Sequence, residues 1–302
     1  MVYLAVIHRK ILVMNPKHAA AGATILWGFT YVLTSTMLPP NPMFIAAMRA
    51  LGGGLLLLLL VRDLPPAGWW GRLIVLGTLN SGFFFGLLFI AALRLPGGVA
   101  ATFQALGPLF MVLLAWPLLG AIPATRKVGA VLVGAVGVSL VVLRGGAAID
   151  LVGVLAALGS ALSVALGALL SHKWGRPRSL LGFTAWQLIV AGVELSAVAL
   201  LVGDLPATLN GTNLLGLLIL ALFLTALAFV LWFQSIEAGG PAAAAPFLLL
   251  TPVTAFVVDI IFRGLVPGAV QLAGVALVIG SLLYSQHVDR KAFRPAHHHA
   301  KP

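Results

Sequence analysis

Long apolar runs, separated by short stretches of proline, glycine or charge, dominate the chain. A helix that crosses a bilayer needs about 20 mostly apolar residues. Strands of a membrane barrel would be shorter and would alternate in polarity, and the run Leu55 to Leu60 does not alternate. The pattern therefore predicts an all-α integral membrane protein with ten transmembrane helices, at residues 18–38, 42–61, 71–94, 98–119, 126–144, 151–172, 180–202, 213–236, 241–263 and 267–286.

Composition supports a membrane protein and excludes several other classes. Of 302 residues, 61% are hydrophobic and 8% are charged, whereas about a quarter of the residues of a soluble domain are charged. The absence of cysteine excludes disulfides and thiolate-ligated metals. The net charge of +11 is scattered between apolar runs instead of forming one basic face, so nucleic acid is not an expected partner.

The basic residues also predict the orientation of the chain. Lys and Arg accumulate in cytoplasmic segments of membrane proteins. When the loops are assigned alternately to the two sides, only Arg94, Arg144 and Arg263 fall on the poorer side. We therefore predict a multi-pass protein of the inner (plasma) membrane, with cytoplasmic tails at residues 1–17 and 287–302.

An internal repeat divides the predicted helices into two sets. A shift of 144 residues places Pro108 on Pro252 and Gly120 on Gly264. The shift predicts two five-helix repeats, at residues 18–145 and 150–286. Because each repeat has an odd number of helices, the second must enter from the opposite side, which gives the inverted repeats found in secondary transporters. The alternative is a chance alignment in a glycine-rich chain.

Several short motifs resemble one family of transporters. They are the turn at residues 91–101, the segment 106–109 (Leu-Gly-Pro-Leu), Trp27-Gly28, and Pro42 placed seven residues before Arg49. In this order and spacing they resemble the EamA branch of the drug/metabolite transporter superfamily, over about residues 18–286. The chain is similar to the bacterial exporters of aromatic amino acids and methyl viologen. The resemblance implies ten helices, in two inverted five-helix repeats, around a central cavity.

Few ionisable residues lie inside the predicted spans. Such a group at the bilayer centre costs about 2.5–3.5 kcal/mol and needs a partner or a function. Asp259 and Arg263 have the i,i+4 spacing of an ion pair on one helix. Arg49 and Glu194 lie at similar depths, so they could pair, and both are candidates for gating or coupling. The alternatives are that Arg49 extends to lipid headgroups, caps carbonyl groups or attracts a substrate carboxylate, and that Glu194 turns toward a neighbouring helix.

Aromatic and neutral polar residues are the candidates for the substrate site. Aromatic planes stack on flat ligands, and amides and hydroxyls bind carboxylate or ammonium without burying a full charge. The alternative is that the aromatic side chains belong to interfacial belts and the polar ones join helices. The candidate binding residues are Trp27, Tyr31, Asn80, Phe84, Gln104, Ser163, Trp186, Trp232 and Thr251, with Gln187 beside them. Pro108 and Pro252 are the candidate hinges, with helix packing as their other role.

The sequence favours transport over catalysis. It contains neither a His-Glu-x-x-His motif nor a Gly-rich phosphate loop, so we expect no enzyme activity, cofactor or metal. We predict a secondary transporter that exports amino acids, aromatic or neutral, or similar small amphiphilic metabolites and drugs by alternating access. The resemblance supplies this substrate class. A channel or a lipid-translocating protein remains the alternative, and we expect only the small solute and membrane lipid as partners, with no obligatory protein partner.

Overall fold

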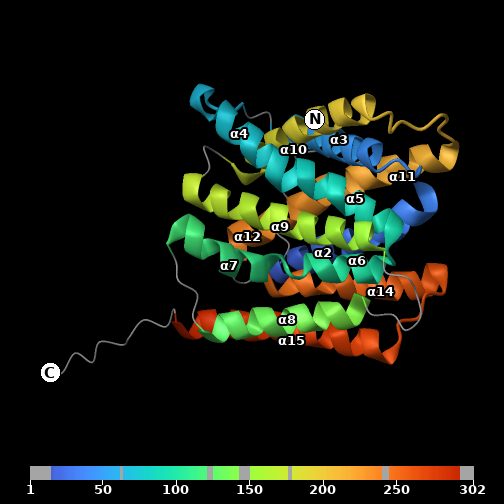
Figure 1. Cartoon of the computed structure of the whole chain (residues 1–302). Helices are drawn as coiled ribbons and strands as arrows, with labels where there is room; N and C mark the ends of the chain where they lie inside the picture. The colour runs from blue at the N-terminus through green and yellow to red at the C-terminus, as the bar shows by residue number, and fades with distance from the viewer. Residues whose placement is uncertain are drawn as a thin grey trace.

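The computed structural model describes residues 15–61, 64–120, 125–142, 150–175, 179–239 and 245–292. Every regular element in these ranges is helical, as expected for an all-α protein. The helices run roughly along one common direction and form a bundle (Figure 1). Residues 1–14 and 293–302, which make up most of the two predicted tails, lie outside the described ranges.

The first half of the chain contains one helix that changes its winding and another that is interrupted. Segment 67–94 is continuous but passes through a π-helical stretch, and segment 97–119 is interrupted by a turn at Ala105 and Leu106. The elements are α2 (Pro16–Met37), α3 (Pro42–Val61), η1 (Ala67–Trp69), α4 (Trp70–Gly77), η2 (Thr78–Phe83), α5 (Phe84–Arg94), α6 (Gly97–Gln104), α7 (Gly107–Leu119) and α8 (Thr125–Val142).

The second half repeats these irregularities. A π-helical stretch interrupts segment 211–239, and a 3-10 stretch precedes the α-helix of segment 245–263. The elements are α9 (Leu151–Trp174), α10 (Leu180–Leu201), α11 (Gly211–Ala221), η3 (Leu222–Leu227), α12 (Ala228–Gly239), η4 (Ala245–Leu249), α14 (Leu250–Arg263) and α15 (Ala269–Ala292).

Local chemistry sets several helix ends. Asn15 accepts a hydrogen bond from the amide of Lys17, and Pro16 follows in the first turn of α2, where its missing N–H costs nothing. Helices α7 and α14 both end at a glycine in the left-handed conformation, with φ of 71° at Gly120 and 63° at Gly264. Glycine adopts this conformation without the steric cost that other residues carry.

Six segments are long and apolar enough to cross a membrane, at residues 42–61, 67–94, 97–119, 151–174, 180–201 and 211–236. The other predicted spans correspond to α2, α8, α14 with η4, and α15, so the full count of ten crossings stays a prediction. Large apolar side chains are exposed on the bundle, among them Leu59 at 69% and Leu201 at 86%. Such a surface is stable against lipid and not against water.

Close glycine contacts bring the helices of the two halves together. Helix α3 packs along α10, and α8 packs along α15 (Figure 1). A Cβ atom at Gly54 would lie 2.9 Å from Cγ1 of Ile189, and one at Gly192 would lie 2.6 Å from Cγ of Leu51. Small residues permit this approach of α3 to α10, which would otherwise be blocked.

The remaining contacts follow the same scheme in each half. Helix α2 packs against α12 and α14, and its counterpart α9 packs against α5 and α7. Helix α6 of the first half also contacts α14 of the second half. The two π-helical stretches begin at Thr78 and Leu222, which are 144 residues apart, the same shift that places Pro108 on Pro252.

Candidate functional site

The guanidinium of Arg49 is held against the π-helical stretch η3. Its Nε atom donates to Oγ1 of Thr225 over 3.1 Å, and its Nη2 atom donates to the carbonyl oxygen of Leu224 over 3.2 Å. The side chain is 3% exposed, and its charged end lies 4.4 Å from the ring centre of Phe85. Such a cation–π contact contributes about 0.5–2 kcal/mol, and hydrogen bonds to a charged group about 1.5–3 kcal/mol each.

Backbone geometry explains why Arg49 reaches this stretch. A π-helical turn carries an extra residue and displaces the usual i to i−4 hydrogen bonds, and such turns are frequent at functional sites. One turn after Arg49, a Cβ atom at Gly53 would clash with Cγ2 of Thr225. The absence of a side chain at Gly53 therefore lets α3 approach η3 closely enough for the two hydrogen bonds.

The suggested ion pair between Arg49 and Glu194 is wrong. Oε1 of Glu194, on α10, lies 2.8 Å from Oγ1 of Thr78, the first residue of η2. Each of the two side chains therefore contacts a different π-helical stretch. Depth along a helix predicted a similar height for them, but it carried no information about the direction in which each side chain points.

Asn80 lies where η2 meets α9 and α10. Its Nδ2 atom donates to Oε1 of Gln187 over 2.7 Å and to Oγ of Ser171 over 3.2 Å. Helix α9 comes close at this point, since a Cβ atom at Gly167 would clash with the side-chain amide of Asn80. Asn80 and Gln187, which the sequence suggested as cavity residues, are thus brought together.

Two serines of α9 bind carbonyl groups of the irregular segment. Ser163 Oγ donates to the carbonyl oxygen of Leu79 over 2.7 Å, and Ser160 Oγ donates to that of Phe84 over 2.9 Å. Gln104 Nε2 in turn donates to Oγ of Ser160 over 3.1 Å. We call the set Asn80, Gln104, Ser160, Ser163, Ser171 and Gln187 the α9 polar seam. Its members lie on α9 or contact it, except Gln187 of α10, which joins the set through Asn80.

Aromatic rings gather at a second place, between α2 and α12. Trp27 lies 5.4 Å from the ring of Trp232 and 5.6 Å from that of Phe229, measured between ring centres. Phe229 stacks on Phe233 at 5.8 Å. The structure thus brings the predicted Trp27 and Trp232 together, and we call these four residues the aromatic cluster.

The other predicted binding residues belong to neither set, although Ser160 of the seam binds the carbonyl oxygen of Phe84. Tyr31 is buried on α2, and Phe84 packs against Phe85 with 5.1 Å between ring centres. Thr251 Oγ1 donates to the carbonyl oxygen of Thr24 over 3.1 Å, which joins α14 to α2. Trp186 lies 5.3 Å from Trp70. The role of all of them in binding stays a prediction.

The two candidate hinge prolines occupy equivalent places. Pro108 lies in the first turn of α7, directly after the turn at Ala105 and Leu106. Pro252 lies in the first turn of α14, directly after the 3-10 stretch η4, and it is buried. In each case the proline follows an existing discontinuity, where its missing N–H costs little.

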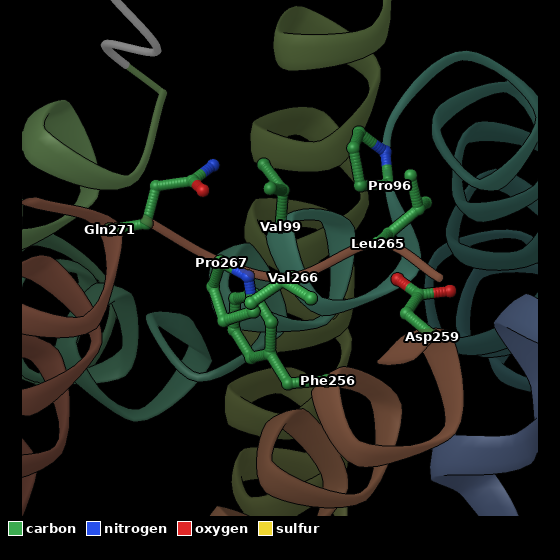
Figure 2. A pocket seen from close by; sticks show the side chains of 8 residues that line it. All are labelled: Pro96, Val99, Phe256, Asp259, Leu265, Val266, Pro267 and Gln271. Carbon is green, nitrogen blue, oxygen red and sulfur yellow. The ribbon is translucent and has the colours of Figure 1, made fainter. Parts of the chain in front are cut away.

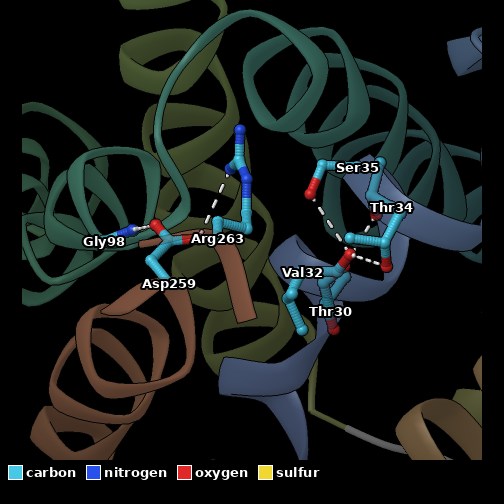
Figure 3. Close-up of polar contacts among 8 residues, drawn as sticks. Thr30, Val32, Thr34, Ser35, Gly98, Asp259 and Arg263 are labelled. Atoms are coloured by element: carbon cyan, nitrogen blue, oxygen red, sulfur yellow. Dashed lines mark hydrogen bonds and ion pairs between the residues drawn. The ribbon is translucent and has the colours of Figure 1, made fainter. Parts of the chain in front are cut away.

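One end of the bundle carries Asp150, Asp204 and Asp259, and we call it the aspartate end. Asp259, 2% exposed, accepts a hydrogen bond from the amide of Gly98 over 2.9 Å and pairs with Arg263 at 3.4 Å (Figure 3). The expected i,i+4 ion pair is therefore present. The same carboxylate also joins α14 to the first turn of α6, which the sequence did not indicate.

Close packing reinforces this junction between α6 and α14. A Cβ atom at Gly98 would clash with the ring of Phe256. A small hollow lies beside it, with Pro96, Phe256, Asp259 and Gln271 among its lining residues (Figure 2). None of the predicted binding residues lines this hollow. Nearby, hydroxyls of α2 bond to their own helix, as Thr34 does to the carbonyl oxygen of Thr30 over 2.7 Å (Figure 3).

Two further carboxylates, those of Asp204 and Asp150, join elements at the aspartate end. The carboxylate of Asp204 accepts from Nδ2 of Asn41 over 3.0 Å and from the amide of Met43 over 2.7 Å. Asp150 caps α9 through the amide of Gly153 and pairs with Arg94 at 3.2 Å. The hydrogen bond from the Gly153 amide lowers the pKa of the Asp150 carboxyl, and the contact with Arg94 lowers it further.

Sequence reasoning missed Thr78, Thr225, Ser160 and Ser171, although each is a polar residue inside an apolar run. The signal that could have found the two threonines is that each lies near the middle of a long apolar helix. Among the described residues, no group of three or more His, Cys, Asp or Glu side chains is placed to hold a metal ion. What the site offers is a row of neutral hydrogen-bonding groups, one buried cation and a cluster of aromatic rings.

Comparisons with known proteins agree on one family. The EamA-like transporter family matches residues 18–143 and 151–285. Protein PecM of Dickeya dadantii (strain 3937) is 37% identical over 289 residues, which cover 93% of this chain and 97% of PecM. The uncharacterized transporter YvbV of Bacillus subtilis (strain 168) is 29% identical over 265 residues, which cover 85% of this chain and 87% of YvbV.

A solved crystal structure shares the fold. It matches with a TM-score of 0.66 and 19% identity, and the match covers 92% of this chain and 99% of that one. At this level of identity the likeness concerns the fold alone.

Proposed function

Because the chain belongs to the EamA-like transporter family, in the drug/metabolite transporter superfamily, we propose that it is a secondary carrier that works by alternating access. Its substrates are amino acids, aromatic or neutral, or similar small amphiphilic metabolites and drugs, and the direction is export across the inner membrane. The family consists of transporters and not of enzymes. The substrate class rests on the resemblance of its motifs to exporters of aromatic amino acids.

The architecture proposed for this carrier is ten crossings in two inverted repeats, at residues 18–145 and 150–286. The observation that carries the proposal is the pair of π-helical stretches, η2 and η3, which begin 144 residues apart and are each contacted by a side chain of the α3–α10 pair. The matching helix contacts of α2 and α9 support the same division. Two halves that can exchange their conformations give inward-open and outward-open states of similar free energy.

Substrate contact is assigned to the α9 polar seam and the aromatic cluster. The seam offers amides and hydroxyls that hydrogen-bond a zwitterion without the cost of burying a full charge. The aromatic cluster offers ring faces to a flat side chain. Neutral groups bind more weakly than paired charges do, which keeps release feasible.

The aspartate end is assigned to the outer face, as the distribution of Lys and Arg predicts, with both termini in the cytoplasm. Opening to the outside then requires α6 and α14 to separate where Asp259 binds the amide of Gly98. Pro108 and Pro252 are assigned to the hinges, because both follow a discontinuity at which the helix can bend.

Counterflow in liposomes tests this proposal. Purified protein is reconstituted with unlabelled phenylalanine inside the vesicles, and uptake of labelled phenylalanine is followed at increasing outside concentration. A carrier shows saturable uptake that is accelerated by the internal substrate. Uptake that rises without saturation would point to a channel, and flip of fluorescent lipids without solute uptake would point to a lipid-translocating protein.

A further inference from the structure

Arg49 contains a buried hydrogen-bond donor that the described residues leave unpaired. Nε and Nη2 are bound to η3, but Nη1 is fully buried and has no hydrogen-bond partner in the described part of the chain. Buried polar groups in proteins almost always have one, so an orphaned nitrogen on a charged group calls for a reason. A guanidinium presents its donors in a planar fork that matches a carboxylate.

The described part of the chain supplies no counter-charge for this cation. The carboxylates whose side chains the structure describes are engaged elsewhere. Asp150 caps α9, Asp204 binds the turn before α3, Asp259 binds Gly98 and Arg263, and Glu194 contacts Thr78. A buried cation without a paired anion is costly, and a ligand that brings the negative charge would offset that cost.

We infer that Arg49 is the anchor for the carboxylate group of the transported solute, bound through Nη1. This inference rests on the proposed function and narrows it, because it requires a substrate with a carboxylate and excludes substrates that are only cationic. The rings of Phe85 and Phe89, with centres 4.4 and 5.8 Å from the guanidinium carbon, then adjoin the part of the solute next to its carboxylate.

The geometry also indicates how binding couples to movement. Arg49 belongs to α3 of the first half, and its other two donors hold Leu224 and Thr225 of the second half. A carboxylate on Nη1 competes for the same positive charge and weakens its hold on η3. The bound solute therefore acts at the contact between the two halves.

Thermal unfolding in detergent tests the binding site without transport. Phenylacetate is the probe, and phenylacetamide, which has the same shape without the charge, is its control. Saturating phenylacetate should raise the melting temperature of the wild-type protein by roughly 2–5 °C, and phenylacetamide should not. An equal rise with both compounds, or with neither, would overturn the inference.

Two variants locate the site, and a third is their control. Arg49→Gln should abolish the rise with phenylacetate, and Arg49→Lys, which keeps the charge without the fork, should reduce it. Arg126→Gln, at an exposed arginine, should leave the rise unchanged. If Arg49→Gln does not fold, the comparison rests on Arg49→Lys. A full rise in whichever Arg49 variant folds would contradict the assignment.

A transport assay distinguishes a failure of this inference from a failure of the proposed function on which it rests. In proteoliposomes, the wild-type preference for phenylalanine over phenylalaninamide should fall about tenfold to a hundredfold in Arg49→Gln. A loss of uptake that is equal for both compounds would mean a purely structural role for Arg49. If the wild-type protein binds phenylacetate but transports neither amino compound, the proposed function fails and the carboxylate site remains.

Discussion

Oγ1 of Thr78 lies 2.8 Å from Oε1 of Glu194 and 2.8 Å from the carbonyl oxygen of Ile74. A hydroxyl group carries a single hydrogen, so it can donate to only one of these acceptors at a time. Both contacts are hydrogen bonds together only when Glu194 is protonated and donates to Thr78, while Thr78 donates to Ile74. The strength of the contact between Thr78 and Glu194 therefore depends on whether the carboxyl is protonated.

Replacement of Glu194 by Gln tests whether this carboxyl carries a coupling proton. Gln has the same shape and can donate to Thr78, so we expect a normal melting temperature and normal counterflow of phenylalanine. If proton exchange drives export, uptake driven by a pH gradient should be lost. If uptake driven by a pH gradient is unchanged in this variant, Glu194 is excluded as the proton site, and downhill export is the mechanism that is left.

Removal of Asp259 should loosen the aspartate end. Asp259→Ala loses both the bond from Gly98 and the ion pair with Arg263, whereas Asp259→Asn keeps an oxygen that can accept from Gly98. We expect the free energy of unfolding to fall by about 1–3 kcal/mol in the Ala variant and by less in the Asn variant. Thermal melts of the two proteins, compared with wild type, measure the difference.

The Asp259 variants also test whether this contact holds the aspartate end of the bundle closed. The chain has no cysteine, so a single one can be placed at Val99, which is buried beside the hollow. Its labelling by a thiol reagent should be about tenfold faster with Asp259→Ala, because weaker closure raises the open population. Labelling at an unchanged rate would mean that Asp259 does not hold this end shut.

Gly53 should tolerate no side chain. In Gly53→Ala the added methyl group would meet Thr225 and push α3 away from η3, with the loss of the Arg49 contacts. We expect a loss of about 1–3 kcal/mol in stability and reduced transport. Gly129→Ala is the matched control, because nothing lies within 4 Å of its new Cβ atom. Equal melting temperatures for the two variants would refute the close approach.

Asp150, which lies outside the membrane spans, should make a pH-dependent contribution to the stability of the protein. Its pKa is lower in the folded protein, chiefly because the Gly153 amide binds the charged form. The contribution is therefore fully present above the ordinary carboxyl value of about 4 and is lost as the pH falls through the lowered pKa. Asp150→Ala should melt below wild type at pH 7, and the gap should narrow below pH 4. A gap that is constant with pH would exclude this capping charge.

Much of the fold follows from patterns that the sequence displays directly. Pro42 marks the start of α3, because proline fits the first turn of a helix, and Gly120 and Gly264 mark helix ends, because glycine adopts the left-handed conformation there. The π-helical stretches were not predictable. One inserted residue leaves the apolar composition of a span unchanged, and composition was the signal that defined each span.

The site was predictable only in part, for a related reason. Asn80 and Gln187 stood out as polar residues in apolar runs, and they do meet. Which way a side chain points around its helix axis depends on the winding of every turn before it. The extra residue in η2 and η3 changes that winding, so the partners of Arg49 and Glu194 could not be read from depth alone.

The central claim is that the two halves cross the membrane in opposite directions. Single cysteines in the cysteine-free chain test it at two exposed residues: Pro40, between α2 and α3, and His172, in the last turn of α9, each near the end of the first helix of its repeat. A membrane-impermeant thiol reagent should label Pro40→Cys only from outside the cell and His172→Cys only from the cytoplasm. Labelling of both positions from the same face would contradict inverted repeats and the carrier mechanism built on them.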